Sequence, residues 1–227
     1  MADEHPKQIE RIAVLGGTGN EGKGLAYRWA RAGLEVVIGS RVLGKAQAAA
    51  DELNKKLAVK KQFVTAMENT QAAAWCELAV LTVPYAAQMG MLEAVKEGLA
   101  GKILINVTVP LVPPKVTKVQ MPAAGSAAQE AQNYLGEQTS VVAAFQNVSY
   151  ERLLNDEEVN CDVLVCGTGK VSRQVVIDLA RKAGMTGWDG GVIENAVVVE
   201  GMTSILIGLN KQFEGKAAGI KITGINE

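Results

Sequence analysis

Three glycines, Gly17, Gly19 and Gly22, fit the pattern G-x-G-x-x-G and have the clearest chemical meaning in this chain. They follow a short apolar run, residues 11–15, and they open a segment with the composition of a helix, residues 21–32. Such a pattern is typical of dinucleotide sites. Its first glycine permits a tight turn, its second lets a pyrophosphate approach the backbone, and its third allows close helix packing. The alternative is a glycine-rich turn without a ligand.

The end of the next apolar run, residues 35–39, indicates which dinucleotide would bind. An NAD site has an Asp or Glu about 20 residues after the glycines, to bind the ribose 2′-hydroxyl. This chain has Ser40 and Arg41 there, with Lys45 one helical turn later. A guanidinium donates two parallel hydrogen bonds to a phosphate, so these residues favour NADP(H). The alternative is a solvated arginine at the start of a surface helix.

The same glycines also satisfy part of the P-loop pattern, because residues 17–23 read G-x-x-x-x-G-K. The next residue is Gly24, so the hydroxyl that would hold Mg²⁺ is missing. This residue argues against an ATPase.

Apolar runs and helix-like segments alternate along the chain, which predicts an α/β fold of the Rossmann type with a doubly wound parallel sheet. The runs are too continuous for strands that are buried on one side only. We expect an NADP-binding domain over residues 1–145 and a smaller C-terminal α/β domain over residues 146–227. The expected strands are 11–15, 35–39, 62–66, 78–83, 103–107, 140–145 and 162–166, and the expected helices are 21–32, 43–57, 85–99, 125–136, 170–183 and 195–213.

The segment 195–213 is apolar on most of its faces, and a helix of this kind must be buried in a core or against another subunit. We therefore expect a homodimer in which this helix contributes to the contact. A wall of the ligand cleft is the alternative role for the same residues. The loop after the strand at 103–107 carries three prolines up to Pro114 and lies where such sheets bind ligands.

Composition excludes several classes of function. The net charge is −1 and aromatic residues make up only 4%, so we expect neither nucleic acid nor membrane as a partner, and only small-molecule cofactors. No apolar run has the length of a membrane span, and the polar N-terminus does not resemble a signal peptide, so a cytoplasmic protein is expected.

The cysteines and histidine argue against metal and nucleophile chemistry. Cys76, Cys161 and Cys166 form no C-x-x-C pair, and the only histidine is His5 in the polar tail. A metal site and a Ser-His or Cys-His nucleophile are therefore not expected. Hydride transfer needs neither, because the cofactor carries the chemistry and the protein positions two rings. We accordingly expect no catalytic acid or base.

Taken together, these segments resemble the NADPH:coenzyme F420 oxidoreductases of archaea and bacteria. The glycine segment 16–24 with Val37–Arg41 is the most specific match, and residues 78–84, 141–148, 163–167 and 219–222 are also similar to the family. The resemblance implies hydride transfer between NADP(H) and the deazaflavin coenzyme F420, whose rings stack in a cleft between two domains.

The resemblance also implies roles for individual residues. Gln146 stands where the family often has histidine, and Ser149 where it often has proline; a glutamine can hydrogen-bond a ring carbonyl but cannot protonate it. The implied sets are Thr18, Gly19, Asn20 and Glu21 at the pyrophosphate; Ser40, Arg41 and Lys45 at the 2′-phosphate; Thr82, Val83 and Pro84 under the nicotinamide ribose and ring; Val148 and Ser149 at the border of the nicotinamide; and Gln146 and Asn147 as further cofactor-binding residues.

Other functions remain possible from the residues themselves. Short-chain dehydrogenases share the glycine pattern but need Tyr-x-x-x-Lys, and none of the four tyrosines here precedes a lysine at that spacing. A non-catalytic NADP(H)-sensing module would need no second domain. An NADPH-dependent reductase of FMN or FAD is not separated from the F420 enzyme by sequence.

Overall fold

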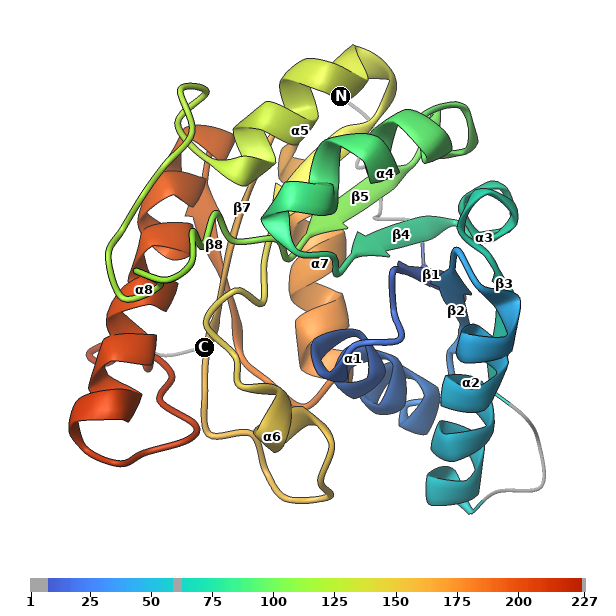
Figure 1. The fold of residues 1–227 in the computed structure, drawn as a ribbon, viewed down its shortest axis with the longest axis horizontal. Helices are drawn as coiled ribbons and strands as arrows, with labels where there is room; N and C mark the ends of the chain where they lie inside the picture. Colours follow the sequence, from blue (N-terminus) through green and yellow to red (C-terminus); the bar gives the residue numbers. More distant parts are fainter. Residues whose placement is uncertain (1–7, 59–62, 226–227) are drawn as a thin grey trace.

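The computed structural model describes residues 8–58 and 63–225, which are built around one eight-stranded sheet. Its strand order is β3-β2-β1-β4-β5-β6-β7-β8 (Figure 1). The pairings from β3 to β6 are all parallel, β7 is antiparallel to β6, and β8 is parallel to β7. The bounds are β1 Arg11–Leu15, β2 Glu35–Ser40, β3 Val64–Glu68, β4 Leu78–Leu81, β5 Ile103–Asn106, β6 Ser140–Ala143, β7 Val163–Gly167 and β8 Gly187–Gly191.

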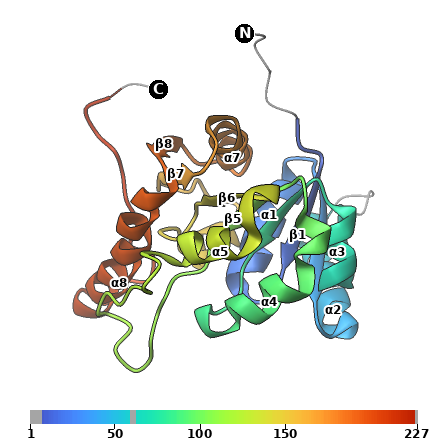
Figure 2. The ribbon, with the colours of Figure 1, turned by 90° about the horizontal axis from the view of Figure 1, so that it is seen from above.

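Helices cover both faces of this sheet (Figures 1 and 2). One hydrophobic core contains residues of α1, α2 and α7, and a second contains residues of α3, α4, α5 and α8. The expected Rossmann-type α/β fold is therefore confirmed. The α-helices are α1 Asn20–Arg31, α2 Leu43–Leu57, α3 Asn69–Trp75, α4 Gln88–Val95, α5 Ala127–Leu135, α6 Tyr150–Leu153, α7 Lys170–Lys182 and α8 Ala196–Gln212; the 3₁₀ turns are η1 Tyr85–Ala87, η2 Glu97–Leu99, η3 Gly136–Gln138 and η4 Ile193–Asn195.

The central strands form because their residues are apolar and buried on both faces. All four residues of β4 are buried, as are the last four of β1 and the last five of β2. Such strands are typical of parallel sheets whose two faces are covered by helices. α1, by contrast, is amphipathic: Leu25, Trp29 and their neighbours are buried, and basic residues lie in its last turn.

The order of the strands determines where a ligand can bind. β1 lies between β2 and β4, so the chain reverses its direction of winding at the β1–β4 boundary. Ligands of open α/β sheets bind outside the carboxyl ends of the strands at this switch point. There the Thr82 amide donates to the Leu15 carbonyl at 3.1 Å, and the Val107 amide to the Leu81 carbonyl at 3.2 Å. The ends of β1, β4 and β5 are thus held side by side.

The C-terminal part of the chain extends the same sheet. β7 pairs with β6 through Ala143 and Cys166, and α7 packs on the face that also carries α1. The Trp29 indole of α1 donates to the Leu179 carbonyl of α7 at 3.0 Å. Strands on both sides of residue 145 therefore share one sheet, and the division into two domains there stays a prediction.

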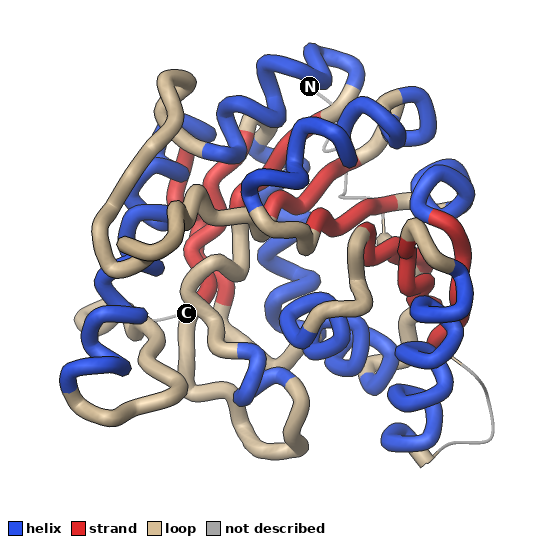
Figure 3. The backbone as a smooth tube through the Cα atoms, viewed as in Figure 1, coloured by secondary structure: helices blue, strands red, loops and turns tan. Residues whose placement is uncertain are grey.

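A loop over residues 107–126 connects β5 to α5 and passes along α8 (tan in Figure 3). Gly201 of α8 lies so close to this loop that a Cβ there would be 3.3 Å from both Met121 and Val119. Within the protomer one side of α8 is buried, whereas Val198 and Ile205 on the other side are 60% and 55% exposed. No helix of the described part of the chain is long and apolar enough to cross a membrane.

Candidate functional site

The three glycines of the pattern have different surroundings at the end of β1. A Cβ on Gly17 would lie 2.7 Å from the Val14 carbonyl oxygen, and one on Gly22 would lie 2.7 Å from the Gly17 Cα. At these two positions a side chain would collide with the backbone, so glycine is required for the turn to form and for α1 to pack against it. A Cβ on Gly19 would meet no atom within 4 Å. Of the three glycines of the pattern, only Gly19 faces open space, as expected for a backbone that a ligand approaches.

That open space belongs to a cleft of about 590 Å³ at the carboxyl ends of β1, β4, β5 and β6. The cleft brings together residues from three of the segments for which the resemblance implies a cofactor-binding role. The residues of these segments that line it are Gly19, Asn20, Glu21, Thr82, Val83, Pro84, Gln146, Asn147, Val148 and Ser149.

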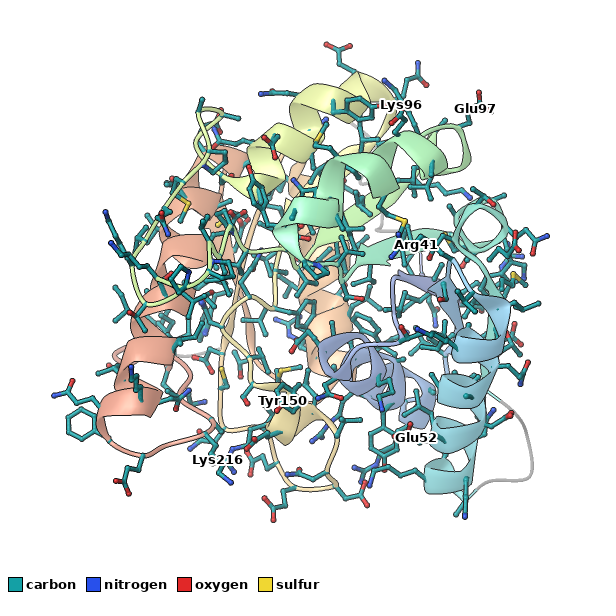
Figure 4. The ribbon with its side chains drawn as sticks, in the orientation of Figure 1. Arg41, Glu52, Lys96, Glu97, Tyr150 and Lys216 are labelled. Atoms are coloured by element: carbon teal, nitrogen blue, oxygen red, sulfur yellow. The ribbon has the colours of Figure 1, made fainter. Side chains whose placement is uncertain are left out.

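Ser40, Arg41, Lys45 and Thr18 do not line this cleft. Ser40 ends β2, next to β1, and its hydroxyl accepts a hydrogen bond from the Val42 amide at 3.2 Å. Arg41 and Lys45 are exposed at the start of α2, and neither side chain has a hydrogen-bond or ion-pair partner among the described residues. Figure 4 shows Arg41 at this end of α2, away from Tyr150 and Lys216 beside α6. The two cations are thus free to bind an anion beside the cleft.

Several cleft residues were not singled out from the sequence. The loop after β5 was expected to lie near a ligand, and the apolar 195–213 segment had a cleft wall as its alternative role. The additional residues that line the cleft are Val107, Thr108, Val109, Leu111, Phe145, Tyr150, Thr203, Leu206, Ile207, Asn210, Lys216 and Ala218. α8 therefore contributes directly to the cleft, although its sequence pattern indicates mainly burial.

A buried polar network supports the floor of the cleft. The Asn106 side-chain amide donates to Gln88 Oε1 at 3.0 Å, while its Oδ1 accepts from the Thr108 amide at 2.8 Å. The Asn106 carbonyl in turn accepts from Gln146 Nε2 at 2.8 Å. Because every one of these groups is withdrawn from water, the network favours a single arrangement of the segments after β5 and β6.

The segment after β6 is held in an unusual backbone conformation. Phe145 is buried, has a φ of 73°, and packs its ring edge-on against Trp29 with centroids 5.7 Å apart. A positive φ is costly for an aromatic residue and must be enforced by surrounding contacts. On α8, the Thr203 hydroxyl donates to the Gln146 carbonyl at 3.0 Å. This turn places the side chains of Gln146 and Asn147 beside the cleft.

Three buried side-chain oxygens at the cleft have no hydrogen-bond partner among the described residues, namely Glu21 Oε1, Gln146 Oε1 and Asn147 Oδ1. The amide nitrogens of Gln146 and Asn147 are occupied, since they donate to the carbonyls of Asn106 and Val199 at 2.8 and 3.0 Å. Native proteins pair almost all buried polar atoms. Unpaired acceptors in a cleft therefore fit a ligand that carries hydrogen-bond donors, such as the carboxamide of a nicotinamide.

Two carboxyl groups near the site, the half-buried Glu21 and the fully buried Glu200, have raised pKa values. Burial raises the pKa of Glu21 to about 8, with no compensating charge. Burial also raises the pKa of Glu200 to about 7, although its oxygens accept hydrogen bonds from the Ala127 and Ala128 amides at 2.7 and 3.0 Å. Glu200 thus binds the N-terminus of α5 to α8, whereas Glu21 lines the cleft. No three His, Cys, Asp or Glu side chains of the described residues are grouped so as to hold a metal ion.

The open space at Gly19 leads to a specific prediction. Gly19→Ala is expected to fold normally, because its φ of −76° suits alanine and the new methyl group meets no protein atom. The methyl group would crowd a bound pyrophosphate at a cost of about 1–3 kcal/mol, and NADPH affinity should fall about 5- to 150-fold. Titration of the nucleotide fluorescence measures the affinity, and thermal unfolding measures the stability.

Two other glycines serve as controls for that variant. Gly90→Ala, on α4, also adds a methyl group in open space; it should leave NADPH affinity unchanged and raise the stability by about 0.5–1 kcal/mol, because alanine is favoured over glycine inside a helix. Gly22→Ala should instead destabilise the fold, because its Cβ would collide with the backbone of Gly17. Unchanged NADPH affinity in a folded Gly19→Ala variant would show that no pyrophosphate approaches this residue.

Comparisons with known proteins identify similar proteins that use NADP. The family described as "NADP oxidoreductase coenzyme F420-dependent" matches residues 11–110. The F420-dependent NADP reductase of Methanocaldococcus jannaschii is 39% identical over 95% of this chain and 99% of its own length. The F420-dependent NADP reductase of Methanothermobacter marburgensis is 42% identical over 96% of this chain and 100% of its own.

Solved structures share the fold. A crystal structure from Arthrobacter sp. FB24 is similar with a TM-score of 0.77 at 24% identity, covering 95% of this chain and 100% of that one. Pyrroline carboxylate reductase of Plasmodium falciparum, with NADP bound, has a TM-score of 0.58 at 14% identity over 92% of this chain and 67% of that one. The resemblance inferred from the sequence is confirmed by these two F420-dependent NADP reductases, whose identity extends over nearly the whole of each chain. The chain belongs to the family of F420-dependent NADP reductases.

Proposed function

We propose that this protein catalyses reversible hydride transfer between NADP(H) and the deazaflavin coenzyme F420. The observation that carries the proposal is membership of the F420-dependent NADP reductase family over almost the full chain. The cleft at the switch point of the sheet supports it, because the cleft joins the dinucleotide glycine loop to the segments after β4 and β6. Both NADP(H) and F420 are co-substrates in this reaction.

In this proposal the glycine loop, from Thr18 to Glu21, binds the pyrophosphate, with the N-terminal N–H groups of α1 directed at it. Ser40, Arg41 and Lys45 bind the 2′-phosphate. Thr82, Val83 and Pro84 lie under the nicotinamide, and the segment from Gln146 to Ser149 borders the two rings. The unpaired oxygens of Gln146 and Asn147 are the natural acceptors for N–H groups of these rings.

The protein's contribution to the rate would be proximity. A hydride passes directly between two bound rings, so the chain must hold them face to face and exclude water. Apolar residues from three segments are suited to this, including Val83, Leu111 and Leu206. No side-chain acid or base is required for the hydride itself. In this proposal residues 146–227 act as the smaller domain that closes the cleft over residues 1–145.

The direct test is an anaerobic assay with NADPH and, in separate reactions, F420, FMN and FAD. We expect the absorbance of F420 at 420 nm to fall and the two flavins to react far more slowly. Rapid reduction of FMN or FAD with no change in F420 would overturn the proposal and leave a flavin reductase in its place.

We further propose that the protein is a homodimer that works in the cytoplasm and takes small molecules as its only partners. Val198, Met202, Ile205 and Leu209 follow one another at helical spacing on the outer side of α8. Val198, Ile205 and Leu209 are exposed on the protomer, and Met202 is half-buried. An apolar stripe of this kind on a water-exposed helix is typical of a subunit contact. The net charge of −1 gives no electrostatic attraction to nucleic acid.

The dimer proposal predicts the effect of a charge in the stripe. Ile205→Glu should convert the protein to a folded monomer, because a carboxylate would be buried without a partner in the contact. Light scattering at micromolar concentration measures the mass. The control Lys182→Glu, at an exposed position on α7, should remain dimeric. A monomeric wild type, or a dimeric Ile205→Glu variant, would contradict this role of α8.

A further inference from the structure

Glu21 has surroundings that are unusual for a carboxylate. It lies in the first turn of α1, two residues after Gly19, and lines the same cleft. Its Oε1 is buried and has no hydrogen-bond partner, and no cation of the described residues forms an ion pair with it. The residue as a whole is half-buried. A carboxylate oxygen that is removed from water normally has such a partner, because the desolvation of a charged group is costly.

The charged and titratable groups around Glu21 do not supply the missing partner. On α1 itself, the Lys23 ammonium is engaged by Glu52 at 2.9 and 3.0 Å. α6 packs against α1 and carries Tyr150, Glu151 and Arg152, of which Arg152 lies 3.8 Å from Glu157. Lys216 lines the cleft from the C-terminal segment. None of these groups contributes to the shift of the Glu21 pKa, which has burial as its only cause.

A bound dinucleotide would make an ionised Glu21 still more costly. Its pyrophosphate carries negative charge and, in the proposed complex, lies at the loop that contains Gly19 and Asn20. Like charges at short distance in a water-poor cleft repel strongly and favour the neutral form of a carboxyl group. A neutral carboxyl group also gains an O–H, which can donate a hydrogen bond to a phosphate oxygen.

We propose that Glu21 enters the NADP(H) complex as a neutral carboxylic acid, so that binding of the dinucleotide is coupled to uptake of one proton by this side chain. The proton comes from solvent and is released again when the dinucleotide leaves. This inference rests on the proposed binding site, and it assigns to Glu21 control over the pH range in which the site binds.

The pH dependence of binding follows from linkage. In the free protein the pKa of Glu21 is about 8, so at pH 7 the carboxyl group is already mostly protonated. Binding of NADPH at this pH therefore takes up only a small fraction of a proton. Above that pKa the Glu21 carboxylate must gain a proton for each NADPH that binds. NADPH affinity should therefore fall by about tenfold between pH 7 and pH 9. The 2′-phosphate contributes little over this range, because phosphate monoesters lose their second proton with a pKa near 6 and are mostly doubly ionised at pH 7.

The experiment compares wild type with Glu21→Gln, which keeps the shape and stays neutral at every pH. NADPH affinity is measured by fluorescence from about pH 7 to pH 9, and proton uptake by calorimetry at pH 8.5 in two buffers of different ionisation enthalpy. We expect the tenfold fall and net proton uptake for wild type and neither of them for Glu21→Gln. Glu52→Gln is the control, because it alters a carboxylate that pairs with α1 outside the cleft, and it should behave as wild type.

The outcomes separate this inference from the proposed site. Wild-type affinity that is flat with pH, or proton uptake that persists in Glu21→Gln, would overturn the role of Glu21 and leave the site intact. Absence of NADPH binding by wild type and Glu21→Gln throughout the pH range would instead overturn the proposed site. Thermal unfolding at pH 7 verifies that each variant is folded, and Glu21→Leu serves as a second neutral variant that should also bind independently of pH.

Discussion

Arg41→Ala is expected to weaken binding of NADPH about 10- to 150-fold, because a charge-assisted contact with the 2′-phosphate is worth about 1.5–3 kcal/mol. NADH has a hydroxyl in place of that phosphate, so its affinity should hardly change. The structure leaves the Arg41 guanidinium exposed at the end of β2, with no carboxylate paired to it among the described residues. Fluorescence titration with the two nucleotides measures the difference directly.

A matched control separates the phosphate contact from general electrostatics. Arg181→Ala removes an exposed arginine from the last turn of α7, where its partner is Asp178. The net charge of the protein changes equally, and NADPH affinity should stay at the wild-type value. If Arg41→Ala bound NADPH and NADH as tightly as wild type, the 2′-phosphate would have to be bound elsewhere.

Arg28→Met is expected to destabilise the protein by about 3–5 kcal/mol, because one buried and three partly buried carbonyl groups would lose their donor. Arg28 lies on α1 and is only 6% exposed. Its Nε donates to the Leu153 carbonyl at 2.9 Å, and its Nη2 lies 2.7, 2.8 and 2.9 Å from the carbonyls of Arg152, Asn155 and Glu157. The guanidinium thereby anchors the chain that directly follows the cleft segment Gln146–Ser149.

Arg31, one turn further along α1, is the control. Its Nη1 lies 3.1 Å from Asp156 Oδ1, but both side chains are largely exposed, at 48% and 66%. Exposed ion pairs contribute about 0–1 kcal/mol, so Arg31→Met should change the free energy of unfolding little. Urea denaturation measures both variants. Equal, small losses would show that the segment after residue 149 is held by other contacts.

The fold could be predicted from local patterns, because each pattern reports directly on burial. The apolar runs at Ile12–Leu15 and Val36–Ile38 are continuous, and the structure buries them on both faces of a parallel sheet. α3 and β8 were missed. α3 has only seven residues, and β8 reads Gly-Trp-Asp-Gly-Gly, a composition that indicates a turn rather than a strand. Its pairing with β7 is a tertiary effect.

The part of the candidate site that one continuous sequence motif defines could be predicted. Gly17, Gly19 and Gly22 have a fixed spacing, although only the structure shows that Gly19 alone faces open space. Thr203 and Leu206 were not foreseen as cleft residues, because an apolar helix has no local feature that distinguishes its cleft side from its core side. The raised pKa of Glu21 likewise comes from its burial in the folded chain, which no local sequence pattern reports.

The central claim is direct hydride transfer between NADPH and F420 in one cleft. The most direct measurement uses NADPH deuterated at both C4 positions, with F420 and the wild-type protein in ordinary water, followed by mass spectrometry of the reduced F420. The proposed function predicts that the product carries one deuterium from the nicotinamide. Reduced F420 that contains only solvent hydrogen, or no reduction of F420 at all, would contradict it.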